Sequence, residues 1–284
     1  MDFQLRDGKA MRLLAPFADM LNHSSEVKPC HAYDPSTGNL SIIAGKDYKA
    51  GDQVFINYGP VGNSRLLRLY GFVLPNNPND SYDLVLSTHP QAPFYENKQK
   101  FWALAGLDST STIPLTLSDP LPENVLRYLR IQRASESDLA VMALQKAKAD
   151  AKISDSNEVE ILQFLVASFD HLLDGFGTPL EKLEQQLAEG GGDYAPGKNF
   201  NAWAAAHVSL GEQRVLRLAK KRAEEMLSAV QSGGSDKTRC ANCGKGDTPL
   251  SLCGRCKGVA YCGRECQVAH YKGGHKAVCR PPAN

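Results

Sequence analysis

Cysteines are concentrated at one end of this 284-residue chain. Of the eight cysteines, Cys30 stands alone and the other seven lie between Cys240 and Cys279. No apolar run approaches the ~20 residues of a membrane-spanning helix, and the residues after Met1 lack the apolar core of a signal peptide. We therefore expect the protein in the cytoplasm or the nucleus, where thiols stay reduced. An odd number of clustered cysteines in such a compartment favours a metal site over disulfides.

The clustered residues form four ordered pairs with short spacers, Cys240-x-x-Cys243, Cys253-x-x-Cys256, Cys262-x-x-x-Cys266 and His275-x-x-x-Cys279. Thiolate and imidazole are the ligands that zinc prefers, and one turn can aim both members of a pair at one tetrahedral ion. Four pairs make two closed sites without a position for a reacting water, so we expect two structural Zn²⁺ ions. So short a segment buries too little apolar surface to fold alone. Zinc binding, about 10–16 kcal/mol per site, would supply the missing folding free energy. A tail with disulfides or free thiols is the alternative.

The same segment resembles the MYND zinc finger over residues 240–279. The match includes Tyr261-Cys262-x-x-x-Cys266-Gln267 and the closing His275-Lys-Ala-Val-Cys279. The cross-braced pairing of that family implies two ligand sets, Cys240, Cys243, Cys262 and Cys266 for one ion and Cys253, Cys256, His275 and Cys279 for the other. His270 falls outside the motif. The resemblance also implies a docking module for a peptide partner, often one containing proline, with Gln267 on its surface and Tyr271 where tryptophan is usual.

Three segments precede the finger. Residues 1–90 contain β-like runs at 40–44 and 54–56 and a short helical pattern at 63–72. From about residue 95 to 230 the apolar period is 3.6, which predicts helices over residues 124–133, 135–152, 157–173 and 209–230. Asp155 with Glu158 predicts a capping box for the third of these helices, and Ser209-x-x-Glu212 predicts the start of the last. A flexible linker follows over residues 231–238.

Two motifs near the N-terminus carry a second signal. Residues 14–24 contain Asn22-His23, and Tyr58 in Phe55-Ile-Asn-Tyr-Gly59 is followed twelve residues later by Tyr70-Gly-Phe72. Together they resemble the SET domain, in the branch that contains Rubisco large-subunit methyltransferase. The helical region, with Asn201-x-Trp203 and Gly211-Glu-Gln-Arg214, resembles the substrate-binding domain of that branch.

The resemblances imply an α+β multidomain protein. Its expected parts are the C-terminal part of a β-rich SET domain over residues 1–90, an all-α substrate-binding-like domain over 91–230, a linker over 231–238 and a two-zinc MYND finger over 239–280. The SET domain of the family begins well upstream of its Asn-His motif, and the glycine-containing segment that wraps the cofactor has no equivalent before residue 14. We therefore expect an N-terminally incomplete SET domain, which keeps an organelle open as an alternative location.

The family transfers a methyl group from S-adenosylmethionine to a lysine of a protein substrate, and in some members to histidine. The resemblance implies that Asn22 and His23 hold the amino acid part of the cofactor, that Phe72 packs on its adenine, and that Tyr58 and Tyr70 form the catalytic acceptor channel. Aromatic walls suit this chemistry because they align the reactants and tolerate a methylated ammonium. The alternative reading makes the two tyrosines core aromatics and Asn22-His23 a polar cap.

Two functions from different classes remain open. One is a protein-lysine N-methyltransferase, weak or inactive as given because half of the cofactor cradle is absent. The other is a non-catalytic adaptor that recruits partners through its finger and uses the SET remnant as a scaffold. Nucleic-acid binding is disfavoured, because the net charge is +1 and the basic residues of the finger lack recognition-helix spacing. No membrane partner is expected.

Overall fold

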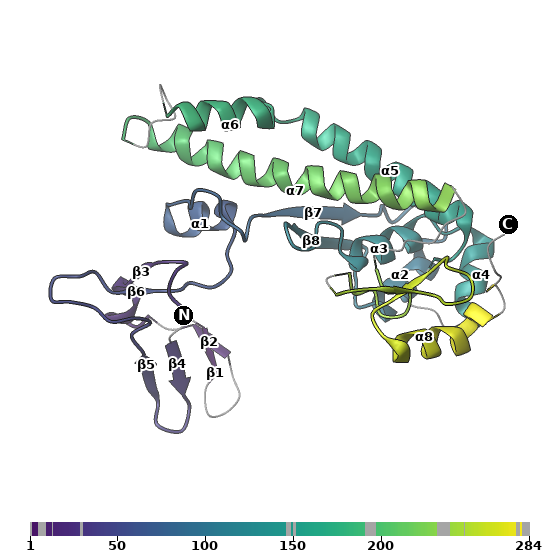
Figure 1. Cartoon of the computed structure of the whole chain (residues 1–284), viewed down its shortest axis with the longest axis horizontal. Coiled ribbons are helices and arrows are strands. Elements are labelled where there is room, and N and C mark those ends of the chain that lie inside the picture. Colours follow the sequence, from purple (N-terminus) through teal and green to yellow (C-terminus); the bar gives the residue numbers. More distant parts are fainter. Residues whose placement is uncertain are drawn as a thin grey trace. The chain divides into compact units, whose positions relative to one another are not determined.

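The computed structural model describes residues 2–4, 10–12, 14–28, 31–145, 149, 152–190, 197–231, 239–246, 248–276 and 279. Cys30 and most of the predicted linker, residues 232–238, lie outside the described residues. The chain divides into two compact units, Met1–Val61 and Gly62–Asn284. Short strands dominate the first unit and helices the second (Figure 1). In the described part of the chain, no helix has both the length and the apolar character needed to cross a bilayer.

The described residues of the first unit form three pairs of short strands. β1 (Asp2–Gln4) pairs antiparallel with β2 (Ala10–Arg12), and β4 (His31–Asp34) pairs antiparallel with β5 (Asn39–Ile42). β3 (Asn22–His23) pairs in parallel with β6 (Phe55–Ile56), after a short 3₁₀ turn, η1 (Ala18–Met20). β5 and β6 confirm the strands predicted at residues 40–44 and 54–56, with shifted ends.

A turn closes the β4–β5 hairpin by local hydrogen bonds. The Asp34 carboxylate accepts from the Ser36 amide at 2.8 Å and from the Thr37 hydroxyl at 2.9 Å. Gly38 takes a φ of +75°, which glycine adopts at little cost. The side chain of Asp34 therefore fixes the register of the hairpin from within the turn.

The second unit begins with α1 (Asn63–Tyr70), which matches the predicted pattern at residues 63–72. β7 (Ser81–Ser87) pairs antiparallel with β8 (Thr110–Thr116), and α2 (Tyr95–Leu104) lies in the connection between these two strands. Before the cysteine cluster the described residues also form α3 (Glu123–Gln132), α4 (Glu136–Gln145), α5 (Asp155–Asp174), α6 (Leu180–Glu189) and α7 (Phe200–Gln231). α5 and α7 lie side by side and pack against each other (Figure 1).

The main hydrophobic core lies among the hairpin and helices α2, α3, α5 and α7. Trp102 stacks on Tyr128 with ring centroids 5.1 Å apart, and its indole N–H donates to the Tyr128 carbonyl at 3.2 Å. Both aromatic side chains are fully buried, so the indole polar atom needs this partner. This core holds the α-helical part of the unit together independently of the cysteine cluster.

Two predicted helix starts are wrong. The N-cap of α5 is Ser154, whose hydroxyl accepts from the Asn157 amide at 3.2 Å, while Glu158 binds the buried Arg130 instead of closing a capping box. α7 begins at Phe200, so Ser209 lies inside it, where its hydroxyl accepts from the side-chain amide Nε2 of Gln213. Both errors have one cause, because the same residue types that cap a helix also serve tertiary or intrahelical contacts. Gly175, predicted to follow α5, is its C-cap.

The region read as helical also contains a strand. β8 buries Ile113 and Leu115 at a two-residue step. α2 carries few regularly spaced apolar residues, whereas α6 repeats Leu180, Leu183 and Leu187 at helical steps, a pattern that the sequence prediction missed. The helix predicted over residues 135–152 ends as α4 at Gln145, and residues 146–148 lie outside the described part. A strand with two buried positions gives no pattern that sequence periodicity can separate from a helix.

The described part of the C-terminal segment contains a short strand pair and a short helix. β9 (Ser251–Leu252) pairs antiparallel with β10 (Ala260–Tyr261), and α8 (Arg264–His270) continues into a single π-turn, η3 (Tyr271–His275). Among its described residues, the buried ones are Ala260, Tyr261, His275 and three cysteines, Cys240, Cys253 and Cys279.

Candidate functional site

The first predicted metal set comes together in the structure. Cys240 and Cys243 lie before β9, and Cys262 and Cys266 follow β10 and enter α8. Their sulfur atoms lie within 4.8 Å of one another, and Cys262 is 3.5 Å from Cys243 and 3.6 Å from Cys266. Ligands about 2.3 Å from a tetrahedral zinc lie about 3.8 Å apart, so this spacing is that of a four-coordinate site.

The second predicted set is gathered in the same way. Cys253, Cys256, His275 and Cys279 place their ligand atoms within 4.8 Å of one another. The sulfurs of Cys253 and Cys279 are 3.8 Å apart, and His275 Nε2 is 3.5 Å from the Cys256 sulfur. The ligand pairs alternate along the chain between the two sets, which is the cross-braced arrangement that the resemblance implies.

The donor groups fit zinc rather than disulfides. The seven cysteines in the described residues are free thiols, and the sulfur distances of 3.5–3.8 Å exceed the ~2.05 Å of a disulfide. The backbone N–H of Cys256 is the main cause that lowers the pKa of Cys253 to about 6, whereas burial is the main cause that raises the pKa of its neighbour Cys279 to about 11. The tetrahedral spacing of the donor atoms, rather than their pKa values, therefore indicates zinc. Both sets are complete with four ligands, so zinc would hold the segment together without offering a reactive position.

The aromatic residues predicted near the N-terminus pair within the first unit. The parallel register of β3 and β6 aligns Asn22 with Phe55 and His23 with Ile56. Tyr58, just after β6, donates its hydroxyl to the Leu21 carbonyl at 2.7 Å, and its ring centroid lies 5.1 Å from that of His23. Residues 35 positions apart therefore meet because one short parallel pairing joins their strands.

The protonation of His23 follows from its hydrogen bond. The Tyr58 amide donates to His23 Nδ1 at 3.0 Å, so Nδ1 carries no proton and the neutral ring holds its hydrogen on Nε2. Burial lowers the pKa of His23, which also favours the neutral form. Asn57 supports the turn after β6, because its side chain donates to the Val27 carbonyl and accepts from the Gly59 amide, each at 2.7 Å.

The other two predicted aromatics belong to the second unit. Tyr70 is the last residue of α1, Gly71 caps the helix with a φ of +76°, and Phe72 follows directly. The two rings are tilted with centroids 6.2 Å apart. Tyr70 is 50% exposed, so it is not a core aromatic.

The five predicted residues are thus divided between the units. The first unit brings His23 and Tyr58 into contact and leaves the Asn22 side chain exposed on β3, and the second brings Tyr70 close to Phe72. The assignment of Asn22, His23 and Phe72 to the cofactor, and of Tyr58 and Tyr70 to catalysis, stays a prediction.

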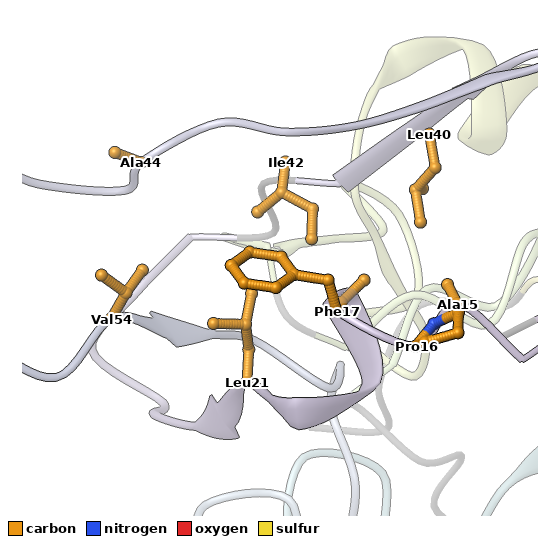
Figure 2. A pocket seen from close by; sticks show the side chains of 9 residues that line it. Ala15, Pro16, Phe17, Leu21, Leu40, Ile42, Ala44 and Val54 are labelled. Carbon is orange, nitrogen blue, oxygen red and sulfur yellow. The ribbon is translucent and has the colours of Figure 1, made fainter.

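An apolar pocket of about 580 Å³ opens beside these strands in the first unit. Figure 2 shows Phe17, Leu21 and Ile42 converging on it. Phe17 is 85% exposed and Val54 also reaches the surface, and the remaining lining residues are Ala15, Pro16, Ala18, Leu40 and Ala44. The sequence does not reveal this pocket, because its residues come from three separate segments, 15–21, 40–44 and Val54. Its wholly apolar lining suits packing against another apolar surface rather than a charged ligand.

Comparisons with known proteins support both resemblances. Residues 89–216 match the family model for the Rubisco LSMT substrate-binding domain, and residues 240–279 match the MYND finger. The actin-histidine N-methyltransferase of Rattus norvegicus is 27% identical over 228 residues, which cover 76% of this chain and 37% of the relative.

Solved structures of Rubisco LSMT also resemble this chain. The structure of Rubisco LSMT bound to sinefungin and monomethyllysine aligns with a TM-score of 0.66 and 26% identity, over 77% of this chain and 51% of that one. The SET domain of LSMT bound to lysine and AdoHcy aligns with a TM-score of 0.68 at 24% identity, over 81% and 53%, which supports the fold. The chain thus spans between about a third and a half of the length of the proteins it matches.

Proposed function

We propose that this chain, which joins a SET-type fold and substrate-binding domain of the Rubisco LSMT branch to a zinc-binding MYND finger, takes part in S-adenosylmethionine-dependent methylation of a protein side-chain nitrogen. The observation that carries the proposal is the contact of His23 with Tyr58 across the β3–β6 pairing. The named activities of the relatives support the reaction class, because all of those compared are protein methyltransferases.

The chain's own residues would orient the reactants. S-adenosylmethionine, when bound, supplies an electrophilic methyl group. The hydrogen bond from Tyr58 to the Leu21 carbonyl fixes the phenol ring, and a fixed ring aligns an acceptor nitrogen better than a freely rotating one. His23, neutral and hydrogen-bonded, can contact the cofactor without adding a positive charge next to the sulfonium.

We take a lysine ε-amine as the acceptor and a histidine ring as the other outcome of the test. The rat relative is named for histidine in actin, whereas the LSMT structure holds monomethyllysine. Either acceptor must be neutral when it attacks, and aromatic walls favour the neutral form of an amine by excluding water.

The test is methyl transfer by the zinc-loaded chain. Tritiated cofactor would be mixed with actin and with fractionated lysate, and labelled peptides would be sequenced by mass spectrometry to identify the modified residue. We expect label that Tyr58→Phe removes and that Tyr33→Phe, a half-buried tyrosine of β4, leaves in place. Equal labelling by both variants, or labelling that Tyr58→Phe leaves unchanged, would contradict the proposed role of Tyr58.

Cofactor binding provides a test that does not depend on the substrate. S-adenosylhomocysteine titrated into the zinc-loaded chain should give weak, saturable binding that His23→Ala abolishes. The comparisons favour a methyltransferase over the adaptor alternative, because relatives and structural neighbours alike carry that activity in their names. Absence of saturable binding would favour the adaptor.

We also propose that the finger binds a proline-containing peptide. α8 presents Val268, 44% exposed, next to the half-buried Gln267, and Tyr271 packs its ring against His275 with centroids 6.2 Å apart. Fluorescence polarisation with proline-containing peptides and their alanine-substituted forms tests the preference. Gln267→Ala should weaken binding, and Ser251→Ala on exposed β9 should not.

A further inference from the structure

The first turn of α1 is capped from a distance. Its N-cap, Gly62, has no side chain to accept a hydrogen bond, yet the Asn63 amide donates to Asp80 Oδ1 at 2.8 Å. Asp80 lies 17 residues downstream and is only 6% exposed. Helix N-termini leave amides unsatisfied, and a carboxylate there both accepts a hydrogen bond and interacts favourably with the helix dipole.

The Asn63 side chain fastens the segment that follows α1. Its Oδ1 accepts from the Leu74 amide at 2.8 Å, and its Nδ2 donates to the Leu74 carbonyl at 2.9 Å. Asn63 is 1% exposed, and the buried Asn77 adds a longer contact to the same oxygen at 3.4 Å. One buried amide therefore binds both backbone groups of Leu74, as a neighbouring strand would.

Helix α7 closes the network from the other side. A Cβ atom at Gly211 would lie 2.2 Å from Asp80 Oδ2, so only glycine allows the helix to pack against this carboxylate. One turn further on, Arg214 donates to the Asn76 side chain at 3.2 Å and pairs with Glu184 of α6 at 2.8 Å. The Gly211-Glu-Gln-Arg214 motif thus contacts the segment between α1 and β7 through its first and last residues.

Two predicted functional aromatics lie between these anchors. Tyr70 ends α1, and Phe72 stands two residues before Leu74, so the stretch that carries both rings is held at Asn63 on one side and at Leu74 on the other. We infer that Asn63, Asp80 and Gly211 are positioning residues that hold Tyr70 and Phe72 in place for the acceptor and the cofactor. This inference rests on the proposed function for the roles of the two rings, and on contacts for the network itself.

The direct contacts predict a coupling between α7 and Asp80. Gly211→Ala should speed backbone amide hydrogen exchange at residues 71–75, because the new methyl group displaces the Asp80 carboxylate. Asp80→Ala should do the same because it removes the cap, but Gly211→Ala should add little in a chain that already carries Asp80→Ala. Independent effects of the two substitutions would overturn the role of Gly211.

Hydrogen exchange of the zinc-loaded full chain, followed by mass spectrometry, measures these rates. Asn63→Ala should speed exchange at residues 71–75 about tenfold, because the Leu74 amide loses its buried acceptor. Asn157→Ala is the matched control, since Asn157 is also a buried helical asparagine that donates to a backbone carbonyl, that of Arg130. Equal exchange at residues 71–75 in the two folded variants would overturn the inference.

Titration with S-adenosylhomocysteine separates this inference from the proposed function. If the wild type binds, Asn63→Ala should weaken binding about tenfold while Asn157→Ala leaves it unchanged. Unchanged binding by Asn63→Ala, despite faster exchange, would overturn the positioning role. If the wild type does not bind, the proposed function fails, and the exchange experiment still decides whether the network holds the segment.

Discussion

The zinc finger and the residues predicted for cofactor binding and catalysis differ in how the fold brings them together. All eight metal ligands lie in one unit and within 40 residues of sequence, and each set of four has its donor atoms within 4.8 Å. The five residues predicted for cofactor and catalysis are divided between two units, and within the first unit the contact of His23 with Tyr58 depends on one pairing of two-residue strands. A metal site imposes its own geometry on a short segment, whereas a site of aromatic and amide groups depends on the fold around it.

Zinc removal should have the largest effect and should be confined to the finger. Structural zinc contributes about 10–16 kcal/mol in small domains, so a chelator should unfold residues 240–279. The core around Trp102 and Tyr128 should stay folded, because none of its buried residues is a ligand. Circular dichroism in the near and far ultraviolet measures both parts. Cooperative loss of all helix signal on chelation would contradict unfolding confined to the finger.

Breaking a buried ion pair should lower the free energy of unfolding of the helical part by several kcal/mol. Arg130 of α3 binds Glu158 with two hydrogen bonds of 2.8 and 2.9 Å, and binds Glu123 at 2.6 Å. Arg130→Ala would leave Glu158 buried without a partner, at a cost of about 3–5 kcal/mol in the free energy of unfolding.

Chemical denaturation of the zinc-loaded chain measures this cost. The control is Arg133→Ala, whose pair with Glu160 at 3.2 Å is more exposed and should contribute under about 1 kcal/mol. Equal costs for the two variants would show that the burial of Arg130 does not decide its contribution.

His270 tests whether the two zinc sets are equivalent. Its ring stacks on His275 with centroids 5.1 Å apart and an angle of 9°, and it is hydrogen-bonded to the buried Tyr261 hydroxyl at 3.0 Å. Groups that orient a metal ligand typically alter metal affinity about 10–100-fold. His270→Ala should therefore speed loss of one of two zinc ions to a chromogenic chelator, and Val268→Ala should not. Equal acceleration of both ions would count against this difference.

A pH dependence of stability is expected at Asp80. Burial is the main cause that raises its pKa from 3.8 to about 6, against hydrogen bonds from Asn63 and the charge of Arg214, and burial also raises the pKa of nearby Glu212. The folded chain therefore binds the proton more tightly than the unfolded one. The stability that Asp80 contributes is complete below pH 3.8 and falls as the pH rises toward about 6.

Asp80→Asn removes this titration. The free energy of unfolding of the variant, relative to the wild type at the same pH, should rise between pH 3.8 and about 6 and level off above. Denaturation at matched pH values, with zinc present throughout, measures the difference so that contributions from the finger cancel. A relative stability independent of pH in this window would show that burial does not govern Asp80.

Sequence reasoning succeeded where one turn of chain determines the contact. The spacing of Cys240 to Cys243 or of Cys262 to Cys266 requires no knowledge of the rest of the fold, and the structure gathers both predicted sets. The core helices α3 and α5 were also predictable, because their apolar residues recur at the helical period. α1 was predicted over residues 63–72 and ends slightly earlier, at Tyr70, where Gly71 caps it.

The failures come from contacts between distant residues. Glu158 reads as a capping residue in sequence but binds Arg130, 28 residues away. The remote cap at Asp80 and the space left by Gly211 have no local signature, because each makes sense only once α1 and α7 are packed. The apolar pocket escaped for the same reason, since its lining is drawn from segments that are not neighbours in the sequence.

Titration of S-adenosylhomocysteine into the full chain, before and after zinc removal, tests the central claim most directly. The claim is that zinc is structural and that methyl chemistry belongs to the site containing His23 and Tyr58. It predicts weak, saturable binding that survives chelation and disappears in His23→Ala. Binding that is lost on chelation, or absent from the zinc-loaded chain, would contradict it.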